Sequence, residues 1–338
     1  MKNMTIRESL EQREKEYLSA YAALSSESKG RDKDEPACDI RPVYQRDRDR
    51  IIHCKAFRRL KDKTQVFLAP EGDHYRTRLT HTLEVSQNAR TIAKALRLNE
   101  DLTEAIALGH DLGHTPFGHA GERALNNVCP MGFEHSEQSV RTVELLEKEG
   151  QGLNLTWETR DGIRNHQTKG MPSTLEGKVV RFSDKIAYIH HDMDDAVRAG
   201  ILTELDVPVE IRRVLGSTPG ERLDTFIHDI ITNSMDKNDV VMSESVAGAM
   251  MALRRFMFEN VYTNSVAKSE ESKAEMLIES LYNYYYDHPS KMPQLYIDLI
   301  QNHKEPVEMV VCDYVASMSD RYAIKVYNDI FVPRSWEF

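Results

Sequence analysis

The stretch "HDLGHTPFGHAGE", residues 110–122, holds three histidines and two carboxylates among thirteen residues, with three glycines and one proline. These side chains cannot simply fill a core, because a buried polar group without a partner is costly. Gly113 and Pro116 interrupt the helical pattern before them, which predicts a tight loop that leads into a following helix. The stretch therefore predicts a polar loop or a reaction site between two helices.

The segments on both sides of this loop show the periodicity of α-helices. Asn99 is placed to cap a helix at residues 100–112, and Thr5 and Glu8 have the spacing of a capping box. Further helices are predicted at residues 5–24, 46–61, 79–98, 122–128, 133–149, 176–200, 244–262, 273–287 and 307–331. Residues 64–77 contain a short β-like run and a Pro/Gly turn, compatible with one small β-hairpin. The predicted fold class is all-α.

No internal repeat or step in composition marks an independent second domain. The predicted organisation is an N-terminal helix with a polar linker (1–39), a core (40–203) and a C-terminal helical region packed on that core (204–338). Together these form a single structural unit. A chain of 338 residues that is 40% hydrophobic has enough apolar surface for a substantial core.

The net charge of -10 argues against a general affinity for nucleic acid, so stable nucleic-acid binding is not expected. Residues 46–63 are a local exception, with eight Lys/Arg against three Asp. This run suits either a solvated helix face or a site for a compact polyanion.

The four cysteines are far apart and form no CxxC pair, which indicates neither a zinc ribbon nor a disulfide framework. The N-terminus has no apolar leader and no stretch is long enough to cross a membrane. A cytoplasmic protein without membrane partners is expected.

Five of the thirteen histidines cluster between residues 81 and 135: His81, His110, His114, His119 and His135. Imidazole and carboxylate ligands from separate helices suit a first-row divalent ion. The candidate ligands are His81, the adjacent His110 and Asp111, and a later carboxylate. We choose Asp184 because apolar neighbours would carry it into a core, with Tyr188 and Asp192 on the same helical face.

Structural interpretations compete with each ligand role. His-Asp pairs also occur at residues 191–192 and 228–229, so chance supplies them readily. We interpret His191 as structural, His228 as an exposed or capped residue, and His166 as part of a surface loop. His110-Asp111 differs from these pairs because a glycine-rich, titratable loop follows it directly.

The pattern His81, His110-Asp111 and Asp184 resembles the H...HD...D signature of the HD superfamily of metal-dependent phosphohydrolases. Five ordered stretches resemble motifs of the deoxynucleoside triphosphate triphosphohydrolases, of which the deoxyguanosine triphosphate enzymes are the best-known type: "FRRLKDKTQVF", "RTRLTHTLEV", "HDLGHTPFGHAGE", "GFEHSEQS" and "SDKIAYIHHDMDDA". The resemblance spans about residues 40–203, and "SDRYAIKVYNDIF" near the C-terminus is also similar. It implies an HD-domain helical bundle with additional C-terminal helices.

The resemblance also implies metal-dependent hydrolysis of dNTPs, dGTP or a broader set, at the α-phosphorus to a deoxynucleoside and inorganic triphosphate. Mn, Mg, Co or Fe would suit the metal site. The implied ligands are His81, His110, Asp111 and Asp184. The implied catalytic residues are His119 with Glu122, His114 at the phosphates, and His135 at the departing 5'-oxygen.

Substrate contacts follow from the same resemblance. Gln65 and Asp192 would read the ribose 3'-hydroxyl, Tyr188 would exclude a 2'-hydroxyl, and Arg78 and Lys185 would contact phosphate. Further cations for the triphosphate could come from Arg58, Arg59, Lys61, Lys63 and Arg76.

Two alternatives stay open at this point. One is an HD phosphatase or phosphodiesterase for another nucleotide. The other is a non-catalytic regulator that binds a nucleotide or single-stranded nucleic acid. The resemblance further implies homo-oligomerisation and a dNTP as allosteric activator.

Overall fold

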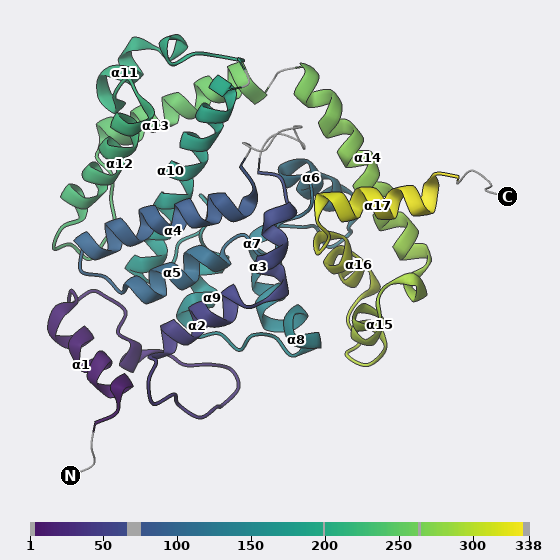
Figure 1. The fold of residues 1–338 in the computed structure, drawn as a ribbon, viewed down its shortest axis with the longest axis horizontal. Coiled ribbons are helices and arrows are strands. Elements are labelled where there is room, and N and C mark those ends of the chain that lie inside the picture. The colour runs from purple at the N-terminus through teal and green to yellow at the C-terminus, as the bar shows by residue number, and fades with distance from the viewer. Residues whose placement is uncertain (1–3, 66–75, 199, 263–264, 334–338) are drawn as a thin grey trace. The chain divides into compact units, whose positions relative to one another are not determined.

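The computed structural model describes residues 4–65, 76–198, 200–262 and 265–333, and these residues form helices joined by turns and loops (Figure 1). The all-α class is therefore confirmed for the described parts of the chain. The longer helices are α1 (Ile6–Tyr17), α2 (Val43–Ile52), α3 (Lys55–Arg59), α4 (Arg78–Ala95), α5 (Glu100–Gly109), α6 (Gly118–Val128), α7 (His135–Arg141), α8 (Glu147–Gly150), α9 (Trp157–Arg164), α10 (Leu175–Arg198), α11 (Val209–Leu215), α12 (Pro219–Ser234), α13 (Glu244–Met257), α14 (Ser265–Asp287), α15 (Gln294–Gln301), α16 (Val307–Ala316) and α17 (Asp320–Phe331).

The chain divides into two compact units. The first unit comprises residues 1–53, 80–110 and 154–264, and the second comprises residues 54–79, 111–153 and 265–338. The boundaries expected at residues 39 and 203 stay a prediction.

Helix α5 is central to the first unit, where it packs on α2, α9 and α10. Asn99 caps it by accepting a 3.2 Å hydrogen bond from the Leu102 amide, and two acidic residues occupy its first turn, as the helix dipole favours. Helices α5 and α9 approach closely because each presents a glycine to an isoleucine of the other. A Cβ added at Gly109 would lie 2.5 Å from Ile163 Cδ1, and one at Gly162 would lie 2.4 Å from Ile106 Cδ1.

Helix α14 organises the second unit and packs along α6, α16 and α17 (Figure 1). Arg123 of α6 forms ion pairs with Glu271 and Glu275 of α14 at 2.5 and 2.8 Å. Beneath these pairs, the core contains buried aliphatic and aromatic residues of the same helices, including Leu125, Ile278, Tyr285, Val311 and Tyr314. This packing holds α6, and therefore the loop before it, against the rest of the unit.

Several of the predicted helices differ in extent from those of the structure. The helix predicted at residues 46–61 is broken after Ile52, and the Cys54 thiol caps the new helix α3 by accepting from the Phe57 amide at 3.3 Å. The helix predicted at residues 100–112 ends at Gly109, which leaves His110 and Asp111 in a turn. Most of the hairpin predicted at residues 64–77 lies outside the described residues. At its two ends, Thr64 and Thr77 form an antiparallel bridge.

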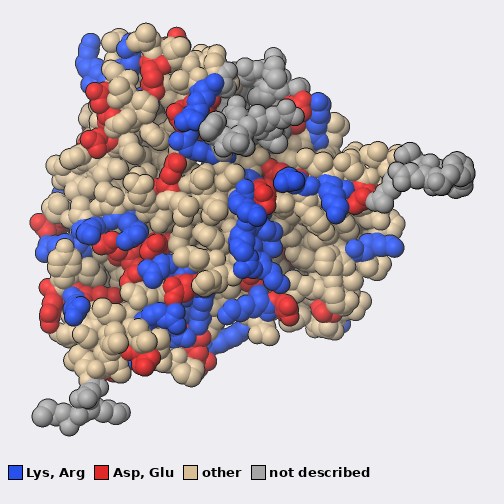
Figure 2. Space-filling model, in the orientation of Figure 1, with Lys and Arg blue, Asp and Glu red and all other residues tan. Residues whose placement is uncertain are grey.

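The basic run of residues 46–63 is partly neutralised within the first unit. Arg46 and Arg50 pair with Glu35 at 3.0 and 2.7 Å, and Arg48 pairs with Asp101 at 3.0 Å. Both signs of charge are spread over the visible face (Figure 2). The arginines of α2 thus have a structural role, as is usual for such runs. Among the described helices, none is long and apolar enough to cross a membrane.

The contact of α5 with α9 predicts the effect of one added methyl group. Gly162→Ala would place a Cβ among the side-chain atoms of Ile106. We expect the free energy of unfolding, measured in urea, to fall by about 1–3 kcal/mol, which is the usual cost of overpacking a core. Gly248→Ala on α13 is the matched control, because no atom beyond its chain neighbours and the backbone of its own helix lies within 4 Å of its added Cβ. That variant should gain up to about 1 kcal/mol from helix propensity. Equal stability of the two variants would contradict the close approach.

Candidate active site

Two histidines and one carboxylate meet within the first unit. His81 projects from α4, His110 directly follows α5, and Asp184 lies midway along α10. Asp184 Oδ1 lies 3.1 Å from His81 Nε2 and 3.7 Å from His110 Nε2. Both rings are buried, whereas the Asp184 side chain is 25% exposed. The apolar neighbours of Asp184 predicted a position inside the core, whereas its side chain lies at the edge of the core.

A hydrogen bond to the main chain fixes which nitrogen of the His110 ring carries its proton. His110 Nδ1 lies 2.7 Å from the Ala107 carbonyl, which can only accept, so this nitrogen carries the proton and Nε2 is left with its lone pair. Burial alone would raise the pKa of the Asp184 carboxyl, but the hydrogen bond from His81 and the nearby imidazoles lower it below the usual value. Neutral imidazole and ionised carboxylate are donors that suit a first-row divalent ion.

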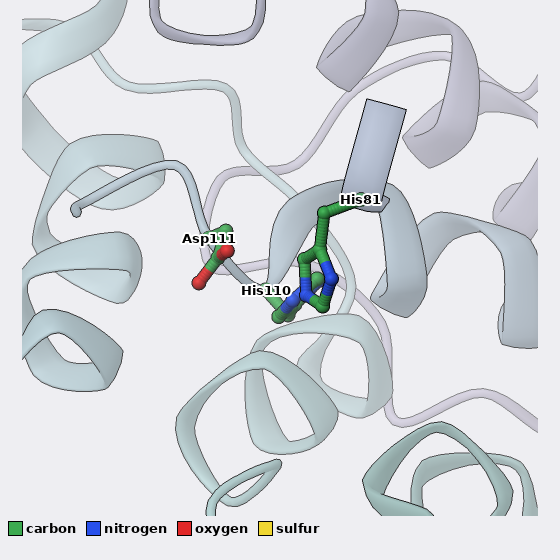
Figure 3. A group of neighbouring side chains, drawn as sticks. All are labelled: His81, His110 and Asp111. Carbon is green, nitrogen blue, oxygen red and sulfur yellow. The ribbon is translucent and has the colours of Figure 1, made fainter. Parts of the chain in front are cut away.

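Asp111 follows His110 directly and begins the second of the three segments that form the second unit. Figure 3 draws its carboxylate together with the rings of His81 and His110. Within the second unit, Asp111 Oδ2 accepts a 2.7 Å hydrogen bond from the buried Arg78 guanidinium. Three of the four expected ligands thus meet within the first unit, and the fourth is attached to one of them by a peptide bond.

A second group of titratable side chains lies within the second unit, on α6, α7 and the loop between α5 and α6. Glu122 of α6 bonds two imidazoles, with Oε2 3.3 Å from His119 Nδ1 and Oε1 2.9 Å from His135 Nδ1. The His114 ring stacks on His135 at a centroid distance of 4.5 Å. His119 is the exposed member, with 53% of its side chain accessible. The pairing of His119 with Glu122 agrees with their spacing, whereas the bond from Glu122 to His135 had no signal in the sequence.

The surroundings of Glu122, His135 and His114 shift the pKa values of these side chains in different directions. Burial acts to raise the pKa of Glu122, but hydrogen bonds from His119 and His135 lower it far more, so the carboxylate is ionised. Burial acts to lower the pKa of His135, but Glu122 and Asp111 raise it above its ordinary value. Burial and the charges of Arg78 and His135 lower the pKa of His114, so that ring is neutral at pH 7. The neutral His114 ring therefore stacks on an imidazole that holds a proton more strongly than an ordinary histidine does.

The loop that carries His114 is held from both sides in the second unit. Asp320 accepts hydrogen bonds from the amides of Phe117 and Thr64 at 3.0 and 2.9 Å. The buried Lys63 ammonium donates to the carbonyls of His114 and Ala316. Lys63 is therefore a structural cation that orders the loop, and the expectation that it supplies charge to phosphates is wrong for this structure. Burial also lowers the pKa of Lys63.

Two of the expected substrate contacts, Gln65 and Arg78, lie in the second unit beside this loop. Both are buried. Gln65 Oε1 and Arg78 Nε have no hydrogen-bond partner among the described residues, and the same holds for His114 Nδ1. Since buried polar atoms in proteins are normally paired, these three atoms are candidates for contact with a bound polar ligand.

The other expected contacts follow Asp184 along α10 in the first unit. Tyr188 lies close to the carboxylate of Asp192, and burial together with this charge raises the pKa of its hydroxyl. Lys185 makes no ion pair with another described residue. Burial and the charge of Arg181 lower the pKa of Lys185 to about 8. The face predicted from the i, i+4, i+8 spacing carries Asp184, Tyr188 and Asp192, that is a carboxylate, a phenol and a second carboxylate in succession.

Two further histidines, His166 and His191, lie near the expected ligands, although the sequence had indicated a ligand role for neither. His166 is buried, with its ring 5.0 Å from that of His110, so the surface-loop interpretation is wrong. Its Nδ1 lies 2.7 Å from the Ile163 carbonyl, a local contact that sequence spacing does not reveal. His191 is buried beside His81, and its place two turns after Asp184 on α10 could have indicated this position. His228 is exposed on α12, as expected.

Comparison with known proteins gives consistent matches. The model of the HD domain matches residues 78–189, and that of the phosphohydrolase-associated domain matches residues 240–329. A deoxyguanosinetriphosphate triphosphohydrolase-like protein of Caldanaerobacter subterraneus subsp. tengcongensis is 58% identical over 333 residues, or 98% of each chain. A protein of the same description from Clostridium perfringens (strain 13) is 49% identical over 340 residues, covering 98% of this chain and 99% of the relative.

Among solved structures, a phosphohydrolase from Bacteroides thetaiotaomicron matches with a TM-score of 0.51 at 18% identity, over 83% of this chain and 68% of that chain. At this identity the likeness concerns the fold alone. Together with the HD-domain match, it confirms the helical HD fold expected from the sequence.

Proposed function

The chain belongs to the family of deoxyguanosinetriphosphate triphosphohydrolase-like proteins, and we propose that it hydrolyses dNTPs, dGTP or a broader set, to a deoxynucleoside and inorganic triphosphate. The observation that carries this proposal is the group in which Glu122 bonds both His119 and His135. A metal site alone has no need of this set, whereas proton transfer at a phosphorus does. The loop that leads into α6, the helix of His119 and Glu122, begins at the expected ligands His110 and Asp111.

In this proposal His81, His110, Asp111 and Asp184 hold one divalent ion, with Mn, Mg, Co and Fe all compatible with the donor set. Two imidazoles and two carboxylates leave coordination positions open. When bound, the ion polarises a phosphoryl oxygen and lowers the pKa of water.

The proposed reaction breaks the bond between the α-phosphorus and the 5'-oxygen. The oxygen of a water becomes part of the triphosphate, and the 5'-oxygen leaves with a proton as the nucleoside hydroxyl. His119, oriented by Glu122, transfers a proton at the α-phosphorus. His135 has a raised pKa and so holds a proton for the departing oxygen. The neutral His114 donates its N–H to a phosphate oxygen.

The substrate contacts in this proposal are those whose polar atoms are otherwise unsatisfied or arranged along α10. Arg78 and Lys185 bind phosphate, and Gln65 and Asp192 bind the ribose 3'-hydroxyl. Tyr188 packs against C2' and leaves no space or partner for a 2'-hydroxyl, which makes the enzyme selective for deoxyribose. Homo-oligomerisation, activation by a dNTP and a cytoplasmic location belong to the same proposal.

Replacing His119 separates proton transfer from metal binding. His119→Ala should lower kcat for dGTP by about 10²–10⁴-fold, because the proton-transfer group is lost. Its metal content, measured by elemental analysis, should equal that of the wild type, since His119 is not a proposed ligand. His228→Ala, at an exposed histidine of α12, is the control and should leave kcat unchanged. An unchanged kcat in His119→Ala would remove this residue from the mechanism.

The sugar filter is tested by changing the ring and the hydroxyl of Tyr188 separately. Tyr188→Ala should raise the ratio of kcat/KM for GTP to that for dGTP, because the space at C2' is opened. Tyr188→Phe keeps the ring and removes only the hydroxyl, so it should keep the wild-type ratio. If Tyr188→Ala also keeps that ratio, the residue does not select the sugar.

A further inference from the structure

His81 has a second bonded neighbour on the side away from Asp184. Its Nε2 faces Asp184, while its Nδ1 lies 3.3 Å from Nδ1 of His191, and the two rings meet edge-on at a centroid distance of 5.4 Å. The other ring nitrogen of His191, Nε2, contacts the carboxylate of Glu84. The chain of contacts therefore runs from Glu84 through His191 to His81, entirely within the first unit.

The two supporting residues come from the same helices as the groups that they support. Glu84 follows His81 by three residues on α4, and His191 follows Asp184 by seven residues on α10. Residues at these spacings share a helix face, so the helix pair that brings His81 to Asp184 also brings Glu84 to His191. The His81 and His191 rings are buried, while the Glu84 side chain is 36% exposed.

Only one placement of protons makes every contact in this chain a hydrogen bond when His81 binds a cation through Nε2. The proton of His81 must then be on Nδ1, which donates to Nδ1 of His191. His191 must therefore hold its own proton on Nε2, where it donates to Glu84. The carboxylate at the end of the chain favours this arrangement, because it accepts but cannot donate.

We propose that Glu84 and His191 are positioning residues that hold His81 in the tautomer and orientation needed to bind the divalent ion, and thereby increase the affinity of the site. This inference rests on the metal site of the proposed function. Partners of this kind behind a ligating histidine fix its ring and raise its basicity, and their loss typically weakens metal binding by about 10–100-fold. His191 therefore has a role beyond packing.

The experiment measures Mn²⁺ affinity of the full chain after removal of bound metal, by competition with a fluorescent chelator. His191→Phe keeps a ring of similar volume and removes both nitrogens, so the dissociation constant should rise by about 10–100-fold. Glu84→Gln keeps an acceptor and loses the charge, so a smaller rise is expected. The double variant should bind no more weakly than His191→Phe alone, because both changes break one chain.

Two controls separate the possible failures. His228→Gln, at an exposed histidine of the same unit, should bind Mn²⁺ as the wild type does. His81→Ala should abolish tight binding. If His81→Ala binds as the wild type does, the metal site of the proposed function fails and the supporting role fails with it.

The inference about His191 is overturned on its own if His81→Ala loses the ion while a folded His191→Phe keeps a dissociation constant within about twofold of the wild type. Thermal unfolding followed by circular dichroism in EDTA checks the fold of each variant. Should His191→Phe not fold, Glu84→Gln decides the question, because Glu84 is partly exposed and its replacement leaves the core unchanged. An unchanged affinity in that variant would equally contradict the proposal.

Discussion

The convergence of His81 and His110 on one oxygen of Asp184 is the contact on which the proposed chemistry depends. Two buried imidazoles and a carboxylate are expensive to desolvate, and each must therefore find a partner. Their nitrogens lie 3.1 and 3.7 Å from Asp184 Oδ1, which places α4, the end of α5 and α10 in fixed relation within the first unit. The close approach of α5 to α9 through Gly109 and Gly162 supports the same arrangement, because it holds the C-terminal end of α5, next to His110, against α9.

In the second unit, buried charged side chains find their partners mainly in the main chain. Its loop from His114 to Phe117 is held by the buried ammonium of Lys63 and the carboxylate of Asp320, both of which bond main-chain atoms. Glu122 then divides its two oxygens between His119 and His135. The result is a pair of imidazoles, His114 and His135, whose pKa values are shifted in opposite directions, an arrangement that suits the proposed proton transfer.

Local features of both units were predictable from the sequence, whereas contacts between distant segments were not. Asn99 caps α5 as expected, and the three-residue spacing of His119 and Glu122 indicated their contact, because caps and helix faces depend on nearby residues. The ammonium of Lys63 bonds the carbonyl of Ala316, and the ring of His166 lies against that of His110, and no local spacing reveals either contact. The break of the helix predicted at residues 46–61 was missed because the capping thiol of Cys54 is an unusual cap. The roles of the site residues remain predictions.

The central claim is that this member of the family cleaves dNTPs at the α-phosphorus. The most direct test incubates the purified chain with each of the four dNTPs and with GTP, singly and mixed, in Mn²⁺ or Mg²⁺ and separately in EDTA. Ion-pair chromatography then resolves the products. We predict deoxynucleoside and inorganic triphosphate, formed only with metal and not from GTP. Release of monophosphate or diphosphate, or no turnover even with mixed dNTPs, would contradict this account and favour another phosphoester substrate or a binding role.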